Sequence, residues 1–264
     1  ATGQPVRRPR NPPDTRKQGE PFAVKTITVE VRDDHLESLA RTKQMTALAE
    51  LVWNALDAEA TEVRVAFADN EIGGTDCIRV SDNGHGLSYD DAMLSFRNLG
   101  GSWKRVNPRT ADRNRVMHGK YGKGRFRAFS LGNVSSWRSA YLDGAEVRVF
   151  SLSGNAARIG EFAVTDPSPA PDPATGMTVE IAEVTDAAGL LRGVKAVEEF
   201  TNIFAPYLRQ YPDTRIFFDG VPVDPASVEE RATVIDLDSD DYRHEPQGQS
   251  PWSRNDEPPS PPKD

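Results

Sequence analysis

Residues 46–58 read TALAELVWNALDA, and this stretch decides the fold that we expect. Its apolar residues recur at intervals of three and four, which predicts a helix with one buried stripe. Beside that stripe Glu50, Asn54 and Asp57 follow one another at i, i+4 and i+7, so they share one face of the helix. A solvated face with a stray asparagine is the plain alternative. A carboxylate, an amide and a second carboxylate in one line favour a polar site.

The segment after this helix predicts strands and then a short motif. Alternating apolar residues predict strands at 63–67 and up to residue 81, and Asp82-Asn83-Gly84-His85-Gly86 follows directly. Asp-Asn-Gly is an ordinary turn sequence. A carboxylate at the end of a strand can also accept a hydrogen bond from the amine of a base, and glycines let a flat ligand approach the backbone. The motif alone is compatible with a turn or with one wall of a base-binding pocket.

A glycine-rich loop lies further along the chain. Residues 118–125 read HGKYGKGR and lead into a predicted helix at 126–131. Glycines before a helix N-terminus leave backbone N–H groups free to bind phosphate. The loop is no dinucleotide fingerprint, because no strand precedes it, and no Walker loop, because it lacks the G-K-[ST] ending. Its glycines and basic residues are Gly119, Gly122, Gly124, Lys120, Lys123 and Arg125.

The net charge of -8 conceals a basic segment. Between residues 93 and 127, ten Lys or Arg residues stand against one acidic residue, so this segment carries +9 and the remainder -17. Such a segment favours a polyanionic ligand, either the phosphates of a nucleotide or a nucleic-acid backbone. A solvated loop whose charge serves only solubility is the alternative.

Composition excludes several classes of protein. With 37% apolar residues in 264, the chain can form a real core. It has no run of about 18 apolar residues and no secretory signal, so we expect a cytoplasmic protein without a membrane partner. The single cysteine, Cys77, excludes an internal disulfide and is expected in the core. The four histidines show no metal-ligand spacing, so the sequence predicts no zinc.

The rest of the chain predicts a scaffold and two unstructured ends. Consecutive strands joined by short turns imply a mostly antiparallel sheet, and a long amphipathic helix at 190–209 completes an α+β fold. We expect helices to cover one face of this mixed sheet. Further strands are predicted at 22–31, 135–142, 147–151, 158–164, 177–184 and 215–223. The predicted organisation is a disordered arm at 1–21, one domain at 22–235 and a disordered acidic, Pro-rich tail at 236–264.

The order and spacing of the three motifs resemble those of the GHKL ATPases. This superfamily contains DNA gyrase, the ninety-kilodalton heat-shock chaperones, histidine kinases and the MutL mismatch-repair proteins. ELVWNALDA is followed about 25 residues later by VSDNGHG, then by a long segment and by GKYGKGRF. The resemblance spans roughly residues 27–219. The sequence of the glycine loop is most similar to that of bacterial heat-shock-chaperone-like and MORC-like ATPases.

The resemblance implies a Bergerat-type two-layer sandwich that binds ATP with Mg²⁺. It implies that Glu50 is the general base that polarises the attacking water and that Asn54 coordinates Mg²⁺. Asp57 would line the nucleotide, and Asp82 would accept a hydrogen bond from the adenine amine. A lid is implied at about residues 99–124. The remaining implied nucleotide contacts are Gly84, Gly86, Gly119, Lys120, Tyr121, Gly122, Lys123, Gly124 and Arg125.

One departure concerns a late strand, GMTVEI at 176–181. Many relatives have a Gly-Thr pair at the start of this strand, and the threonine hydroxyl helps to hold the adenine. Here Met177 takes that position, and the adjacent Thr178 faces the other way in a regular strand. Thr178 is therefore a nucleotide contact only if a bulge turns its side chain.

The resemblance implies hydrolysis of Mg·ATP, with lid closure as a conformational switch. The alternative is a histidine-kinase-like phosphotransfer or nucleotide-sensing module that does not hydrolyse ATP. Glu50 favours hydrolysis, because phosphotransferases of the superfamily generally lack this carboxylate. Whether a second copy or a partner protein joins on ATP binding is open, as is the client. DNA is a possible partner, but no motif beyond the basic segment supports it.

Overall fold

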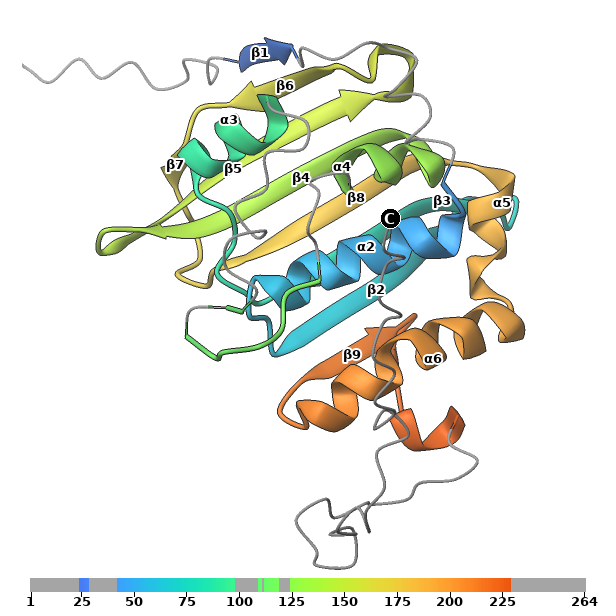
Figure 1. Ribbon diagram of the computed structural model, residues 1–264. Helices are drawn as coiled ribbons and strands as arrows, with labels where there is room; N and C mark the ends of the chain where they lie inside the picture. Colours follow the sequence, from blue (N-terminus) through green and yellow to red (C-terminus); the bar gives the residue numbers. More distant parts are fainter. Residues whose placement is uncertain (1–23, 29–41, 98–108, 111, 119–123, 229–264) are drawn as a thin grey trace, which may run out of the picture. The chain divides into compact units, whose positions relative to one another are not determined.

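A ten-stranded sheet forms one layer of the part of the chain that the structure describes (Figure 1). The computed structural model describes residues 24–28, 42–97, 109–110, 112–118 and 124–228. Across the sheet the order is β1 (Val24–Thr28), β6 (Glu161–Thr165), β5 (Glu146–Asn155), β4 (Gly132–Asp143), β8 (Gly176–Val184), β3 (Thr75–Asp82), β2 (Glu62–Asp69), β9 (Arg215–Phe218) and β10 (Val221–Pro222), and β7 (Ser168–Pro169) pairs with β5.

Neighbouring strands of this sheet run antiparallel with one exception among the described pairs. β2 and β9 are parallel, and Glu62 pairs with Arg215. The central strands β4, β8 and β3 form continuous antiparallel ladders, in which Val80 pairs with Val179 and Val179 with Trp137. The sheet is therefore mixed and mostly antiparallel, as the short connections between the predicted strands imply.

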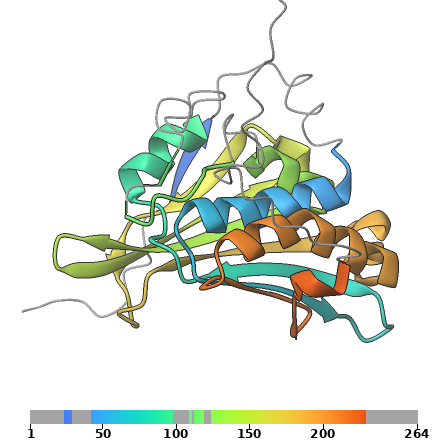
Figure 2. The ribbon, with the colours of Figure 1, turned by 60° about the horizontal axis from the view of Figure 1, so that its bottom comes forward.

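The helices lie together over one face of the sheet, as Figure 2 shows from the side. α2 crosses the middle of the sheet, with α4 beside it and α6 along its other flank (Figure 1). The helices are α2 (Gln44–Asp57), α3 (Tyr89–Arg97), α4 (Gly124–Arg127), α5 (Asp186–Gly189) and α6 (Val194–Gln210), and the 3₁₀ turns are η2 (Ala128–Ser130), η3 (Ala156–Arg158), η4 (Leu190–Arg192) and η5 (Pro225–Val228).

The core fills the space between α2 and the sheet. Leu48 and Val52 of α2 are fully buried, and they belong to the same core cluster as Ile78 and Val80 of β3. The opposite face of the sheet carries charges, such as the ion pair between Arg79 and Glu180. One apolar face and one polar face explain the alternating pattern that predicted the strands.

The α+β fold class and the layer of helices on one face are confirmed. The structure corrects the position of Cys77, which is half-buried and lies between the exposed Asp76 and the buried Ile78, rather than in the core. The predicted domain limits at 22 and 235, the arm and the tail lie outside the described residues. All described residues lie in one structural unit, 1–228. Among them, no helix is long and apolar enough to cross a membrane.

The apolar face of α2 should dominate the stability of the domain. Leu48 is fully buried, so Leu48→Ala should lower the free energy of unfolding by about 2–5 kcal/mol, through lost burial and the cavity left behind. Leu94 of α3 is 62% exposed, and Leu94→Ala is the matched control, with an expected change within about 0.5 kcal/mol. Urea unfolding followed by circular dichroism measures both, and equal losses would contradict this picture of the core.

Candidate functional site

The polar face of α2 carries the three residues that the helical spacing aligned. Glu50 is half-buried, Asn54 is exposed and Asp57 is buried. The carboxylate of Glu50 accepts a hydrogen bond from the guanidinium of Arg127, at the end of α4. Because α4 begins at the last glycine of the glycine loop, this ion pair ties α2 to the segment that follows the loop.

Asp57 joins α2 to the segment that enters the glycine loop. Its Oδ1 accepts a hydrogen bond of 2.8 Å from the backbone N–H of His118. The imidazole of His118 stacks on the indole of Trp53, with ring centroids 3.8 Å apart, and Trp53 in turn packs against Phe204 of α6. The start of the loop is thus fixed to the same helix as its end.

Residues 109–110 and 112–118 belong to a tight turn, called the turn 109–118, that packs on the end of α2. The backbone N–H of Thr110 donates to the carbonyl of Arg115, and Arg109 forms an isolated bridge with Val116. Arg115 is buried and donates to the carbonyl of Ala60 at 2.7 Å and to Asp213 at 3.0 Å. This part of the basic segment is therefore neither a solvated loop nor a free polyanion site.

Arg125 has a different environment from the one that its position in the glycine loop predicts. Its side chain is buried, and the guanidinium lies over the rings of Phe96 and Phe126, at 5.3 and 4.7 Å from their centroids. Burial lowers the pKa of Arg125 to about 10. The predicted contact of Arg125 with phosphate requires this side chain to leave the aromatic cluster.

Asp82 lies at the end of β3, where the motif predicted it. One carboxylate oxygen accepts hydrogen bonds from the backbone N–H groups of Gly84 at 2.8 Å and Met177 at 3.3 Å. Burial raises the pKa of Asp82 to about 6, although both N–H groups act in the opposite direction. The second oxygen has no hydrogen-bond partner among the described residues, so it is available to a donor on a ligand.

Gly84 and Gly86 are required by the packing of the backbone. A Cβ atom on Gly84 would lie 2.5 Å from the carbonyl oxygen of Ala58, at the end of α2. Gly86 has a φ of 70°, and its Cβ atom would lie 2.2 Å from the carbonyl oxygen of Ala140 in β4. The sequence predicted these glycines as room for a ligand, whereas the structure shows that they let the loop pack between α2 and the sheet.

Thr178 lies in a regular part of β8, paired with Ser81 on one side and Arg138 on the other. The neighbouring Val179 is buried in the core beneath the helices. Since successive side chains of a strand alternate, Thr178 faces the opposite side of the sheet. The bulge that a nucleotide contact by Thr178 requires is not present between Met177 and Ala182, and the structure does not support that contact.

Much of the glycine loop lies outside the described residues. The loop residues concerned are Gly119, Lys120, Tyr121, Gly122 and Lys123, and residues 99–108 and 111 of the predicted lid also lie outside the described residues. Gly124 is described as the first residue of α4. The roles predicted for these residues therefore stay predictions.

The sequence analysis missed two partners of the α2 residues. Arg127 lay in the basic segment, but no spacing could pair it with a carboxylate 77 residues away. Glu59, just beyond α2, is buried, and its Oε1 accepts the backbone N–H groups of Asp112 at 2.9 Å and Arg113 at 2.8 Å. Its only signal in the sequence was a charge directly after a helix rich in polar site residues.

The three motifs converge on α2. The glycine loop is fixed to it at both ends through Asp57 and Glu50, and the loop after β3 contacts it where the backbone N–H of His85 donates to the carbonyl of Ala58. The arrangement places the half-buried carboxylate of Asp82, the exposed amide of Asn54 and the described part of the basic segment around one helix. Such a set can bind a purine base at one end and phosphates at the other.

Comparisons with known proteins agree with this geometry. Residues 42–169 match the family of histidine kinase-, DNA gyrase B- and HSP90-like ATPases. The chain is 57% identical over 47 residues to the DNA mismatch repair protein MutL of Acidobacterium capsulatum. This aligned stretch covers 18% of this chain and 7% of that protein. It is 41% identical over 87 residues to MutL of Opitutus terrae, and this stretch covers 33% of this chain and 12% of that protein.

These relatives are mismatch-repair proteins, so the finer resemblance to chaperone-like and MORC-like ATPases stays a prediction. The matched stretches span only a small part of the relatives' length, 8% for MutL of Trichlorobacter lovleyi. The family match and the arrangement of the motifs around α2 lead to one conclusion: residues 42–169 of the chain belong to a domain of the GHKL superfamily of ATPases.

Proposed function

We propose that this domain binds Mg·ATP beside α2 and hydrolyses it to ADP and phosphate. The observation that carries the proposal is the convergence of three distant motifs on one helix, through Glu50, Asp57 and Ala58. Convergence alone also fits a nucleotide-binding domain, and the carboxylate at position 50 is what favours hydrolysis.

Asp82 is the proposed adenine site. Its carboxylate lies at the end of β3, with one oxygen held by backbone N–H groups and the other without a partner among the described residues. An ionised carboxylate accepts hydrogen bonds but donates none, which suits the exocyclic amine of adenine. Fixing one oxygen to the backbone orients the other, so the base would bind to a preorganised acceptor.

Glu50 is the proposed general base. A carboxylate that removes a proton from water must have an oxygen free to accept it, and Arg127 binds the Glu50 carboxylate in this structure. We infer that Glu50 separates from Arg127 when nucleotide binds. The phosphates of ATP offer Arg127 another anionic partner, so binding and release of the base would be coupled.

Asn54 is the proposed protein ligand of Mg²⁺. It is exposed on the polar face of α2, one helical turn from Glu50, and its amide oxygen is a donor that suits this ion. Mg²⁺, when bound, would neutralise charge that develops on the phosphates. Asp57 cannot serve equally well, because its carboxylate is buried and already accepts the backbone N–H of His118.

The proposed lid spans about residues 99–124, and residues 112–118 of it are fixed to the end of α2. Asp57 and Glu59 accept three backbone N–H groups of this part. We further propose that the protein is cytoplasmic and that a second copy or a partner protein binds the domain when the lid is closed.

The second candidate is a nucleotide-sensing or phosphotransfer module without hydrolysis. The ion pair between Glu50 and Arg127 favours it, because it occupies the carboxylate on which hydrolysis would depend. The two candidates share the adenine and phosphate sites and differ only in turnover.

Replacement of the base separates the two candidates. Glu50→Gln should leave the affinity for a non-hydrolysable ATP analogue unchanged and reduce the rate of phosphate release about 100-fold or more, since the amide cannot accept the proton. Glu199→Gln, an exposed site on α6, is the matched control. Calorimetry and phosphate release, measured at several protein concentrations, give both quantities. Equal rates in Glu50→Gln and the wild type would exclude this role for Glu50.

Arg127 should strengthen ATP binding. Arg127→Gln keeps much of the side-chain length but removes the charge that would pass from Glu50 to the phosphates, so the affinity for a non-hydrolysable ATP analogue should fall about tenfold. An affinity equal to that of the wild type would mean that Arg127 stays with Glu50 when nucleotide binds. Calorimetry measures the affinity, and single-turnover measurements at saturating ATP separate it from a change in the rate of hydrolysis.

The affinity for the adenine base should fall on acidification. The pKa of Asp82 is about 6 without ligand, so below this pH the carboxyl is protonated and must lose its proton before it can accept the amine. Affinity should be constant above pH 7 and fall by up to about tenfold per pH unit below 6. Adenosine, which has no phosphate to titrate, is the probe, followed by NMR. Asp82→Asn should bind it weakly and without this pH dependence; a flat wild-type profile would contradict the assignment.

A further inference from the structure

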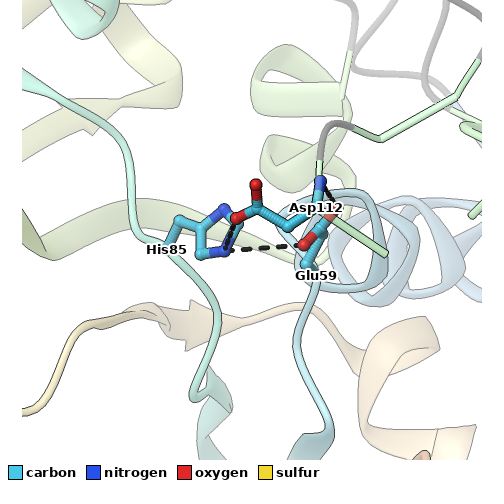
Figure 3. A group of neighbouring side chains, drawn as sticks. All are labelled: Glu59, His85 and Asp112. Carbon is cyan, nitrogen blue, oxygen red and sulfur yellow. Dashed lines mark hydrogen bonds and ion pairs between the residues drawn. The ribbon is translucent and has the colours of Figure 1, made fainter. Parts of the chain in front are cut away.

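Three potential metal ligands from three separate segments meet beside α2, as Figure 3 shows. Glu59 follows α2, His85 lies in the loop after β3, and Asp112 lies in the tight turn 109–118. The Nε2 atom of His85 is 3.6 Å from Oε2 of Glu59 and 3.4 Å from Oδ2 of Asp112. The three ligand atoms all lie within 4.8 Å of one another.

These separations suit a common bound ion. A Zn²⁺ ion at about 2.1 Å from tetrahedral nitrogen and oxygen ligands places those ligand atoms about 3.4 Å apart. The two distances from His85 Nε2 lie close to this value. Small side-chain rotations would therefore complete the coordination, and the backbone already has the required arrangement.

Glu59 supplies the observation that points to a ligand. The residue is 5% exposed, and its two carboxylate oxygens have different environments. Oε1 accepts the backbone N–H groups of Asp112 and Arg113, whereas Oε2 is buried without a hydrogen-bond partner and faces His85. A buried carboxylate oxygen without a partner is costly, and a cation between Glu59 and His85 would remove this cost.

The backbone of Glu59 is also unusual. Glu59 has a φ of 63°, a left-handed conformation that favours glycine, so a glutamate here is strained. The N–H groups of Asp112 and Arg113 hold its carboxylate in place through Oε1.

We propose that Glu59, His85 and Asp112 form a binding site for a divalent transition-metal ion, Zn²⁺ or Mn²⁺. One imidazole and two carboxylates are a donor set that both ions accept, and Zn²⁺ binds such sets more tightly. The side chain of Asp112 is 74% exposed, so water can complete the coordination. Spacing between histidines predicted no zinc because the two other ligands are carboxylates from different segments.

The ion would link three segments that surround the proposed nucleotide site. It would tie the turn 109–118 to the end of α2 and to the loop that follows Asp82. The site is distinct from the Mg²⁺ site proposed at Asn54, since it uses none of the same side chains. The metal is therefore structural in this proposal and does not depend on nucleotide.

Calorimetric titration of the full chain with Zn²⁺ and with Mn²⁺, without nucleotide, tests the proposal. The wild type should bind one ion that Glu59→Gln and His85→Ala each weaken about tenfold or more. Asp76→Asn removes an exposed carboxylate from β3, outside the cluster, and should have no effect. This control separates the site from general attraction of cations to an acidic protein.

Two further measurements keep the test independent of folding. Asp112→Asn changes an exposed side chain and keeps the N–H that Glu59 accepts, so it should weaken metal binding in a protein with an unchanged circular dichroism spectrum. Co²⁺ should give the visible absorption of a four-coordinate site in the wild type and not in His85→Ala. Equal Zn²⁺ affinity in the wild type, Glu59→Gln and His85→Ala would overturn the proposal. No uptake of either Zn²⁺ or Mn²⁺ by the wild type would also overturn it, and would mean that His85 only pairs with the two carboxylates. Neither result would bear on ATP hydrolysis.

Discussion

Two buried carboxylates at the end of α2 determine where the turn 109–118 lies. Asp57 accepts the backbone N–H of His118, and Glu59 accepts those of Asp112 and Arg113. A charge removed from water must be compensated by hydrogen bonds, so these two side chains and three N–H groups constrain one another. The entrance to the glycine loop is consequently held at a fixed place on the helix, although no regular secondary structure holds it.

The same helix connects the site to the core. One face of α2 buries Leu48 and Val52 against the sheet, while the other carries Glu50, Asn54 and Asp57. The sheet therefore positions the helix, and the helix positions the motifs that come from elsewhere in the chain. A substitution that shifts the apolar face would displace the polar face with it, so fold and site are not separable in this domain.

The fold could be predicted largely from the sequence because its signals are local. Helical spacing at 46–58 and alternation in the strands depend on neighbouring residues, and short turns fix which strands are antiparallel. Each end of α2 lies within two residues of the predicted helix, and β9 and β10 lie within the strand region predicted at 215–223. The resemblance to GHKL ATPases added what local signals cannot give, namely that three separated motifs meet.

The parts of the site that could not be predicted depend on pairings between distant side chains. The sequence shows that residues 93–127 are basic, but not that Arg115 binds Asp213, that Arg125 covers Phe96 or that Arg127 binds Glu50. Charge density indicates an anionic partner without saying whether that partner is internal. Likewise Glu59 and His85 meet because the loop after β3 packs closely on Ala58. The spacing of residues in the sequence cannot predict this contact.

The parallel pairing of β2 with β9 has a consequence for synthesis of the protein. β9 follows α6, so the edge of β2 has no partner until residues 215–218 have left the ribosome. A nascent chain would until then present a row of unpaired backbone groups, which can template aggregation. Because α6 also packs on Trp53 of α2, the last part of the domain to emerge completes both the sheet and the support of the helix. Such a domain is expected to mature only after translation has passed its final strand, and to rely on protection of that edge before then.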